Sequence, residues 1–107
     1  MKINPDFDIL ETTLRDGNYI VDFGFTSQDT GNLACILEKA GVNMIEIGHG
    51  LGLGASLKIK PAAASDEDYI KNTKKNLNKA KIGMFAIPNI ANLEDIKKAA
   101  DLGLDFI

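Results

Sequence analysis

The sequence has 107 residues, a formal net charge of −3 at pH 7 and 45% hydrophobic residues, which fits one soluble globular domain over residues 1–107. Its mild acidity gives no sign of the basic patch that nucleic-acid-binding domains carry. No apolar run reaches about 18 residues, so we predict no membrane-spanning helix and no membrane partner. With one cysteine no internal disulfide is possible, and a reducing cytoplasm is the simplest setting. Cys35 lies in an apolar helical pattern, which indicates a buried small hydrophobe rather than a nucleophile.

The first predicted element is a strand over residues 8–13, which gives way to a loop over residues 14–25 that contains Gly17. Arg15 and Asp16 therefore lie side by side just after the strand. In proteins that alternate strands and helices, active sites form at the C-terminal ends of parallel strands. There a guanidinium can hold a carboxylate or enolate oxygen, and a carboxylate can ligate a hard divalent cation. An ordinary surface ion pair in a turn is the alternative interpretation.

Three amphipathic helices are predicted, each beginning after a side chain that can cap it, at Thr26, Ser65 and Asn92. Gly41 and Gly103 mark the ends of the first and third helices, in the left-handed position after the last turn. The side chains predicted to face the core recur at helical spacing: Leu33, Ile36, Leu37, Ala40, Tyr69, Ile70, Thr73, Leu77, Leu93, Ile96 and Ala99 or Ala100.

Three further strands are predicted at residues 43–47, 81–87 and 104–107, the second of these ending at Pro88. A loop over residues 48–56 follows the first of them and holds four of the chain's ten glycines at alternate positions. Glycine permits a positive φ and a close approach of the backbone to a ligand. The G-x-G-x-x-G spacing is absent, so this loop is not a dinucleotide-binding fingerprint.

The alternation of strands and helices predicts right-handed crossovers and a parallel sheet, which is the α/β class. Two architectures fit: a small open doubly wound sheet, or the N-terminal part, about three and a half βα units, of a TIM (β/α)8 barrel. An end on an apolar strand with no helix to cover it favours the barrel. The side chains that would then face a half-built barrel interior are Ile9, Met44, Ile45, Phe85 and Phe106.

The residues Thr12-Thr13-Leu14-Arg15-Asp16-Gly17 resemble the signature of the DRE-TIM metallolyases. This superfamily contains the 3-hydroxy-3-methylglutaryl-CoA lyases, the isopropylmalate and homocitrate synthases, and the 4-hydroxy-2-oxovalerate aldolases. Its third signature residue is a glutamate near the end of the second strand, and Glu46 occupies that place. The stretch from Glu46 to Ser56 is most similar to the aldolase branch, in which the glutamate is followed by His-Gly and a serine-containing loop.

The resemblance implies a metal-dependent (β/α) barrel that makes or breaks carbon–carbon bonds through an enolate. Arg15 would hold the oxo and carboxylate oxygens of the substrate and stabilise the enolate. Asp16 would ligate a divalent cation, Mn²⁺ or Mg²⁺. Glu46 would orient Arg15 through a charge-assisted hydrogen bond, and Gly50 and Ser56 of the glycine-rich loop would contact the substrate.

Two positions depart from the aldolase pattern. Tyr19 stands where the aldolases carry a histidine that acts in acid–base catalysis, and a phenol with an ordinary pKa of about 10 is poorly matched to a base near pH 7. Tyr19 therefore either donates a proton or only lines the pocket. Leu51 replaces the aspartate of His-Gly-Asp, which leaves His49 as either a catalytic contact to substrate or metal, or a structural part of the loop.

The His-x-His pair that supplies two of the family's metal ligands is absent, since His49 is the only histidine. We therefore predict an N-terminal fragment, inactive by itself, of a longer aldolase that cleaves a 4-hydroxy-2-oxoacid to pyruvate and an aldehyde. The longer enzyme is expected to be a homo-oligomer with an aldehyde dehydrogenase as a further partner. The alternatives are an acyl-CoA-dependent lyase or synthase of the same superfamily and a non-catalytic doubly wound binding domain.

Overall fold

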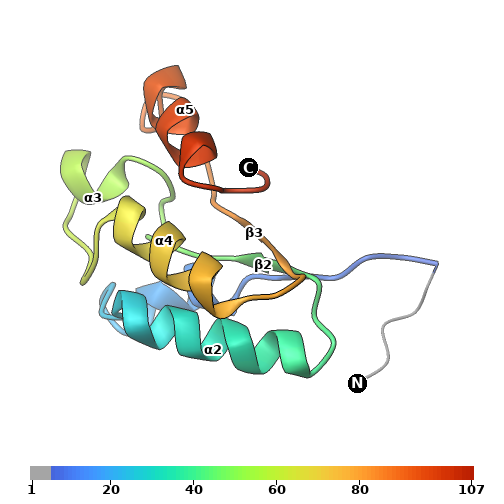
Figure 1. Cartoon of the computed structure of the whole chain (residues 1–107). Helices are drawn as coiled ribbons and strands as arrows, with labels where there is room; N and C mark the ends of the chain where they lie inside the picture. Colours follow the sequence, from blue (N-terminus) through green and yellow to red (C-terminus); the bar gives the residue numbers. More distant parts are fainter. Residues whose placement is uncertain (1–5) are drawn as a thin grey trace.

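The computed structural model describes residues 6–107 and contains a three-stranded parallel sheet in the order β1-β2-β3 (Figure 1). The strands are β1 Leu10–Glu11, β2 Met44–Glu46 and β3 Lys81–Gly83. Ile45 of β2 lies opposite Glu11 on one neighbour and Ile82 on the other. A single parallel bridge between Gly83 and Phe106 adds the end of the chain to the other side of β3. The predicted parallel α/β arrangement is confirmed, although each strand is shorter than predicted.

Helical segments connect the strands: α1 Thr13–Asp16, the 3₁₀ turn η1 Gly17–Tyr19, α2 Ser27–Lys39, α3 Ala55–Lys58, α4 Asp66–Asn76 and α5 Leu93–Asp101. The predicted caps are present. The Thr26 hydroxyl accepts the N–H of Asp29 at 3.0 Å, and the Asp29 carboxylate accepts the N–H of Thr26 at 3.1 Å. Ser65 and Asn92 accept the corresponding N–H groups of α4 and α5. Among the helices that the structure describes, none is long and apolar enough to cross a bilayer.

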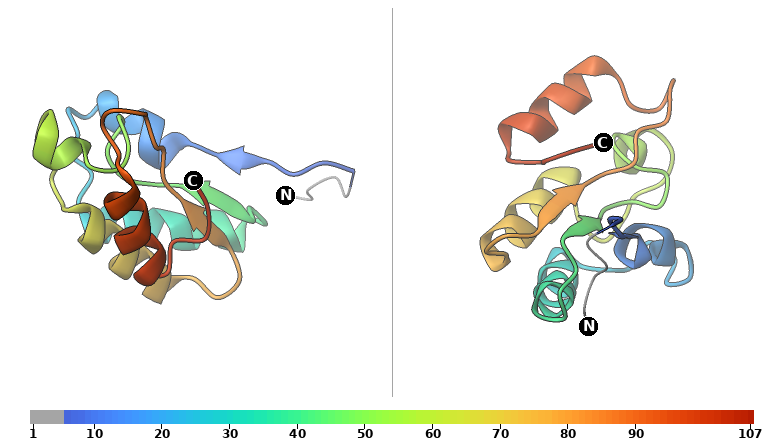
Figure 2. Two further views of the ribbon diagram at one scale, coloured as in Figure 1. Left: turned by 90° about the horizontal axis from the view of Figure 1, so that it is seen from above. Right: turned by 90° about the vertical axis from the view of Figure 1, so that its right-hand side faces the viewer.

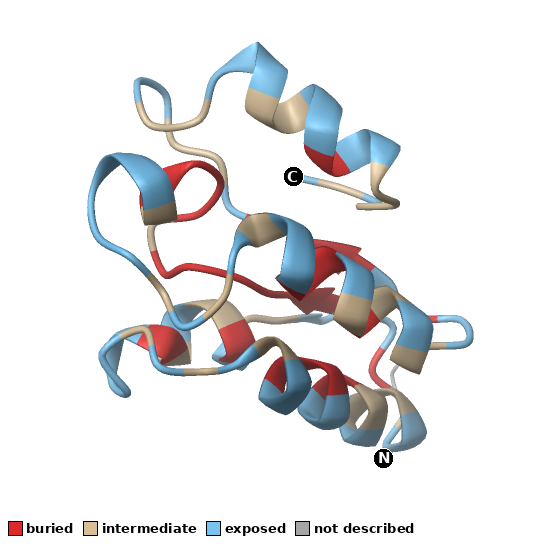
Figure 3. Cartoon of the chain, turned by 60° about the vertical axis from the view of Figure 1, so that its left-hand side comes forward, coloured by how far each residue is buried: buried red, intermediate tan, exposed pale blue. Residues whose placement is uncertain are grey.

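One hydrophobic cluster lies between the sheet and the helices (Figure 3). It takes in alternate residues of β2, β3 and their extensions, which share one face of the sheet: Ile45, Ile47, Ile82 and Met84. The three longer helices cover that face with Ala34, Tyr69, Ile70 and Ala99. Because α2 packs on α4 and α4 on α5, these helices follow one another along the same side of the sheet (Figure 2).

α2 turns a different face to the core from the one that its apolar spacing predicts. Leu33 and Ile36, predicted to face the core, are 39% and 60% exposed. The buried positions include Gly31 and Ala34 instead. A Cβ atom on Gly31 would lie 3.1 Å from the backbone oxygen of Asn72, so α2 and α4 approach closely through small residues. The prediction was therefore wrong for Leu33, Ile36 and Ala40, which lie outside this contact, whereas Leu37 packs against the core as predicted.

Three other burial predictions were wrong. Leu93 is exposed, because the face of α5 that meets the core passes through Ile96 and Ala99. Cys35 is half-buried rather than buried. Ile45 is buried against the helices instead of facing the uncovered side of the sheet, because its two chain neighbours occupy that side.

The Glu38 side chain ties the end of α2 to the turn between α4 and β3. Its carboxylate accepts the backbone N–H groups of Asn78, Lys79 and Ala80 at 3.0, 2.7 and 2.6 Å. These hydrogen bonds, that of Ala80 foremost, hold the pKa of Glu38 below its ordinary value of 4.5. The charged form of Glu38 therefore stabilises the connection that leads into β3.

We predict that Glu38→Gln lowers the free energy of unfolding at pH 7 by roughly 1–2 kcal/mol, because the amide offers one acceptor oxygen and turns two donors toward N–H groups. The pKa of Glu38 is lowered in the folded state, so its stabilisation is present above pH 4.5 and is lost as the pH falls through the folded-state pKa. Urea titrations at neutral and acidic pH measure this. The difference between wild type and variant should shrink in acid, whereas Asp8→Asn, at an exposed position outside the helices and strands, should match wild type throughout.

Candidate active site

Arg15 and Asp16 lie on α1, a single helical turn that starts directly after β1. The Glu11 carboxylate accepts the N–H of Thr13 at 2.7 Å, and the Thr12 carbonyl accepts the N–H groups of Arg15 and Asp16 at 3.1 and 2.7 Å. These bonds begin a helix where the sequence predicted the end of a strand and then a loop, so that prediction was wrong. The predicted location at the C-terminal end of β1 is confirmed.

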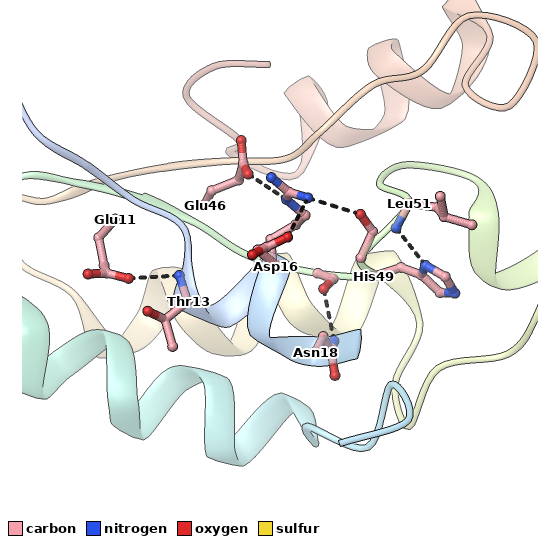
Figure 4. A network of polar contacts seen from close by, with 10 residues as sticks. Glu11, Thr13, Asp16, Asn18, Glu46, His49 and Leu51 are labelled. Carbon is pink, nitrogen blue, oxygen red and sulfur yellow. Dashed lines mark hydrogen bonds and ion pairs between the residues drawn. The ribbon is translucent and has the colours of Figure 1, made fainter. Parts of the chain in front are cut away.

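Arg15 is held by Glu46, which lies at the C-terminal end of β2 (Figure 4). The Nε–H of Arg15 donates to the Glu46 carboxylate at 2.6 Å, and Nη1 donates to the backbone oxygen of Gly50 at 3.3 Å. The side chains of Arg15 and Glu46 are 15% and 10% exposed, so the ion pair is largely shielded from water. Within residues 6–107, Nη2 of Arg15 has no hydrogen-bond partner. The guanidinium therefore has a fixed orientation and an edge of free donors.

The glycine-rich loop presents its backbone oxygens to residues on α1 and η1. Asn18 is fully buried and donates from its amide to the backbone oxygen of Gly48 at 2.9 Å, while its side-chain oxygen accepts the N–H of Phe25 at 3.2 Å. The carbonyl of Gly50, two residues further on, binds Arg15. Asn18 and Arg15 thus bind two carbonyls of the same loop.

Tyr19 packs its ring against Gly50. A Cβ atom at Gly50 would lie 2.7 Å from the Tyr19 ring, so only glycine permits this contact. The ring also meets Phe23 edge-on at 5.3 Å between centroids. Tyr19 is partly exposed, and its hydroxyl has no hydrogen-bond partner among the described residues. The phenol therefore lies close to Gly50, whose carbonyl binds Arg15, and its hydroxyl is available to a ligand.

His49 is fully buried, and both of its ring nitrogens bind the backbone. Nδ1 accepts the N–H of Leu51 at 3.0 Å, which leaves the proton on Nε2 to donate to the oxygen of Lys60 at 2.9 Å. Its ring stacks on Phe23 at 4.1 Å. Of the two roles that the sequence left open, these contacts favour the structural one, since neither nitrogen is free for a substrate. The predicted catalytic role stays untested.

Ser56 is not brought to Arg15. Its hydroxyl accepts the N–H of Ala62 at 3.0 Å, and it lines a separate cavity of about 250 Å³ between α3, α4 and α5. That cavity contains none of Arg15, Asp16, Tyr19 or Glu46. The predicted substrate contact through Ser56 therefore lacks support from its surroundings.

The sequence matches the model of a known protein family. The family model described as HMGL-like matches residues 6–107. The chain belongs to the HMGL-like family. The predicted DRE-TIM metallolyase resemblance is thereby confirmed.

Relatives of this HMGL-like chain carry two kinds of name. It is 43% identical over 97 residues to a protein named 4-hydroxy-2-oxovalerate aldolase 4 from Rhodococcus opacus, covering 90% of this chain and 28% of that protein. It is 40% identical over 96 residues to a 4-hydroxy-2-oxovalerate aldolase from Carboxydothermus hydrogenoformans, covering 89% and 29%. It is 38% identical over 99 residues to a protein named oxaloacetate decarboxylase from Mycobacterium tuberculosis, covering 92% and 29%. The chain thus spans less than a third of the length of these relatives.

In this HMGL-like chain, Asp16 has the chemistry of a metal ligand, but the described residues place no further metal ligands around it. Its carboxylate is 67% exposed and lies 3.5 Å from Nη1 of Arg15, which leaves oxygen lone pairs free for a hard cation. Within residues 6–107 there is no group of three or more histidine, cysteine, aspartate or glutamate side chains that could hold a metal ion. The described residues therefore contain no complete metal site, and the role of Asp16 as a ligand stays a prediction.

Two residues at this site of the HMGL-like chain were missed by sequence reasoning. Asn18 bridges η1, the glycine-rich loop and the start of α2, and its only sequence signal is an amide directly after Arg-Asp-Gly. Phe85 lies with its ring centroid 4.5 Å from Cζ of Arg15. The sequence predicted Phe85 on the uncovered face of the sheet, but strand alternation could not place it beside a particular side chain.

Proposed function

We propose that this chain is the N-terminal part of a longer metal-dependent aldolase that cleaves a 4-hydroxy-2-oxoacid into pyruvate and an aldehyde through an enolate. The observation that carries the proposal is the Arg15 guanidinium, fixed by Glu46 at the ends of adjacent parallel strands with Nη2 free. The names of the aldolase relatives support it. The acyl-CoA-dependent alternative has no such support among these relatives.

Arg15 would act on the charge that develops in the reaction. Removal of the proton from the substrate's 4-hydroxyl lets the C3–C4 bond break, the aldehyde leaves, and the electron pair moves onto the 2-oxo oxygen as an enolate. The donors on Nη2 would bind the 2-oxo and carboxylate oxygens and stabilise that charge. Protonation of the enolate at C3 then gives pyruvate. Glu46 contributes by holding the guanidinium in place, and does not need to touch the substrate.

The implied Mn²⁺ or Mg²⁺ would be held by Asp16 together with ligands from outside the described residues. When bound, such an ion supplies Lewis-acid stabilisation of an enolate oxygen. Asp16 fits this role because it is exposed beside Arg15 at the same end of the sheet. The identity of the ion is part of the proposal.

We further propose that the longer chain forms a (β/α)8 barrel. Two observations support this: the three longer helices cover one face of the sheet, as in a barrel wall, and Phe106 begins a fourth parallel pairing next to β3. A doubly wound sheet would carry helices on both faces. Among residues 6–107 no strand pairs with the outer edge of β1 or with the far side of Phe106, and further strands would pair there.

Decarboxylation of oxaloacetate is a second candidate, and Tyr19 is the observation that favours it. In that reaction the bond to the C4 carboxylate breaks, CO₂ leaves, and the same pyruvate enolate forms without removal of a hydroxyl proton. A phenol in place of a histidine base would then be sufficient, because only the enolate carbon needs a proton. A relative named oxaloacetate decarboxylase is consistent with this. Assays of the longer protein with both substrates distinguish the candidates.

We predict that Asp16→Asn in the longer protein weakens Mn²⁺ binding and lowers turnover by about 10³-fold or more, because a charged ligand is lost. Arg15→Lys should be nearly as damaging, since an ammonium cannot reproduce the fork of donors. Steady-state kinetics and Mn²⁺ titration measure both effects. Asp101→Asn, an exposed carboxylate on α5, serves as the matched control. Near-normal turnover in either site variant would reject the assigned role.

We predict that Tyr19→Phe lowers the rate of aldol cleavage by about 10²–10⁴-fold if the hydroxyl transfers a proton in the transition state. Decarboxylation of oxaloacetate should fall much less, because no hydroxyl proton is removed there and the phenol would act only after the carbon–carbon bond has broken. The variant keeps the ring contacts with Gly50 and Phe23, so its thermal midpoint should not change. A loss below tenfold on the aldol substrate would assign Tyr19 to packing alone.

We predict that the 107-residue chain by itself self-associates and has no aldolase activity. Apolar side chains are exposed near the sheet edges at Ile9, Leu10, Phe85 and Ile107, a surface that isolated soluble domains avoid. A two-fold dimer would cover it most simply. Sedimentation velocity tests this: Leu10→Lys on β1 should weaken association, whereas Leu93→Ser on α5 should not. A stable monomer that binds Mn²⁺ at micromolar affinity would contradict both the dimer and the half-barrel.

A further inference from the structure

We propose that Phe85 is a positioning residue for Arg15: its ring contacts the guanidinium and holds the free donor edge toward the substrate. The ring centroid lies 4.5 Å from Cζ of Arg15. A guanidinium in this position is attracted by the negative face of the ring, and the attraction grows when water is excluded. What the oriented guanidinium binds rests on the proposed function, but the contact itself does not.

The contacts of Arg15 restrain its guanidinium group in two directions. Glu46 and the carbonyl of Gly50 accept hydrogen bonds from Nε and Nη1, and such bonds fix the guanidinium within its own plane. They do little to stop the plane from tilting. Cζ of Arg15 lies over the face of the Phe85 ring, and this contact opposes that movement. Together these partners leave Nη2 as the unoccupied edge.

The backbone at Phe85 is itself anchored by the glycine-rich loop. The Phe85 carbonyl accepts the N–H of Leu53 at 2.8 Å. Gly52 has a φ of +86° and sits so close that an added Cβ would lie 2.0 Å from the Phe85 oxygen. The loop that binds Arg15 through Gly50 therefore also fixes the position of the ring above it.

Phe85 is not explained by packing within the hydrophobic core of the described residues. It is 39% exposed and lies outside the hydrophobic cluster, whereas its neighbour Met84 is buried within it. Strand alternation turns Phe85 to the face that the helices do not cover. Among the described residues the ring's aromatic or cationic contact is with Arg15 alone. An exposed phenylalanine held in this place is therefore best accounted for by the guanidinium.

Arg15 is the only arginine in the sequence, so a chain labelled with ¹⁵N-arginine gives a single side-chain Nε–H signal in NMR spectra. We expect Phe85→Leu to speed exchange of that proton with water by about 3- to 30-fold, the range that a lost cation–π contact implies. Phe85→Tyr, which keeps the ring, should stay within about twofold of wild type on the same scale.

Phe106→Leu is the matched control for general loosening of the sheet. Phe106 packs on Gly83, where an added Cβ would lie 2.1 Å from its ring, so this variant should lose stability. It should leave the Arg15 signal unchanged. Exchange within twofold of wild type in Phe85→Leu, or equal acceleration in Phe106→Leu, would overturn the positioning role.

The longer protein adds a second readout. There, Phe85→Leu should lower kcat/KM for the 2-oxoacid by a similar factor, and Phe85→Tyr should restore it. Loss of kcat/KM without any change in Nε–H exchange would overturn the positioning role. A wild-type protein that cleaves neither 2-oxoacid would reject the proposed function, while the exchange comparison would still decide the role of Phe85.

Discussion

The ion pair between Arg15 and Glu46 is the interaction on which the organisation of this site depends. It joins residues 31 positions apart in the chain at 2.6 Å, and it is largely shielded from water. Removing one partner of such a pair leaves a charge without compensation, which costs far more than the pair contributes. The pairing of Glu11 with Ile45 in the sheet brings Arg15 and Glu46 together, because it places the turn after β1 beside the end of β2.

The glycine-rich loop binds the residues around that ion pair and so shapes the site. Its carbonyls at Gly48 and Gly50 bind Asn18 and Arg15, and its buried His49 ties the loop to the oxygen of Lys60. A histidine with both nitrogens on the backbone holds a loop rigid without exposing a titratable group to a ligand. The loop therefore supports the site through its backbone, and its glycines are needed where rings and carbonyls approach closely.

One charge-stabilising centre can serve both reactions named among the relatives. Aldol cleavage and decarboxylation of a 2-oxoacid give the same enolate, so under the proposed function the same guanidinium would stabilise both. They differ in whether a hydroxyl proton must first be removed, and Tyr19 is the residue whose role would differ between the two reactions. Membership of the HMGL-like family is thus consistent with the proposed role of Arg15, but it does not determine the role of Tyr19.

The sequence by itself determined the features that depend on a few neighbouring residues. The caps at Thr26, Ser65 and Asn92, the parallel α/β alternation and the contact of Glu46 with Arg15 were all predictable, because caps and strand alternation are local and the Arg-Asp and Glu elements form a known pattern. Tertiary structure alone decided which face of α2 is buried, since close approach to α4 at Gly31 outweighs the apolar spacing of Leu33 and Ile36. It also decided the helical turn under Arg15, the separation of Ser56 from the site and the ring of Phe85 over the guanidinium. The last two depend on contacts between segments far apart in the chain, whose distances no local pattern encodes.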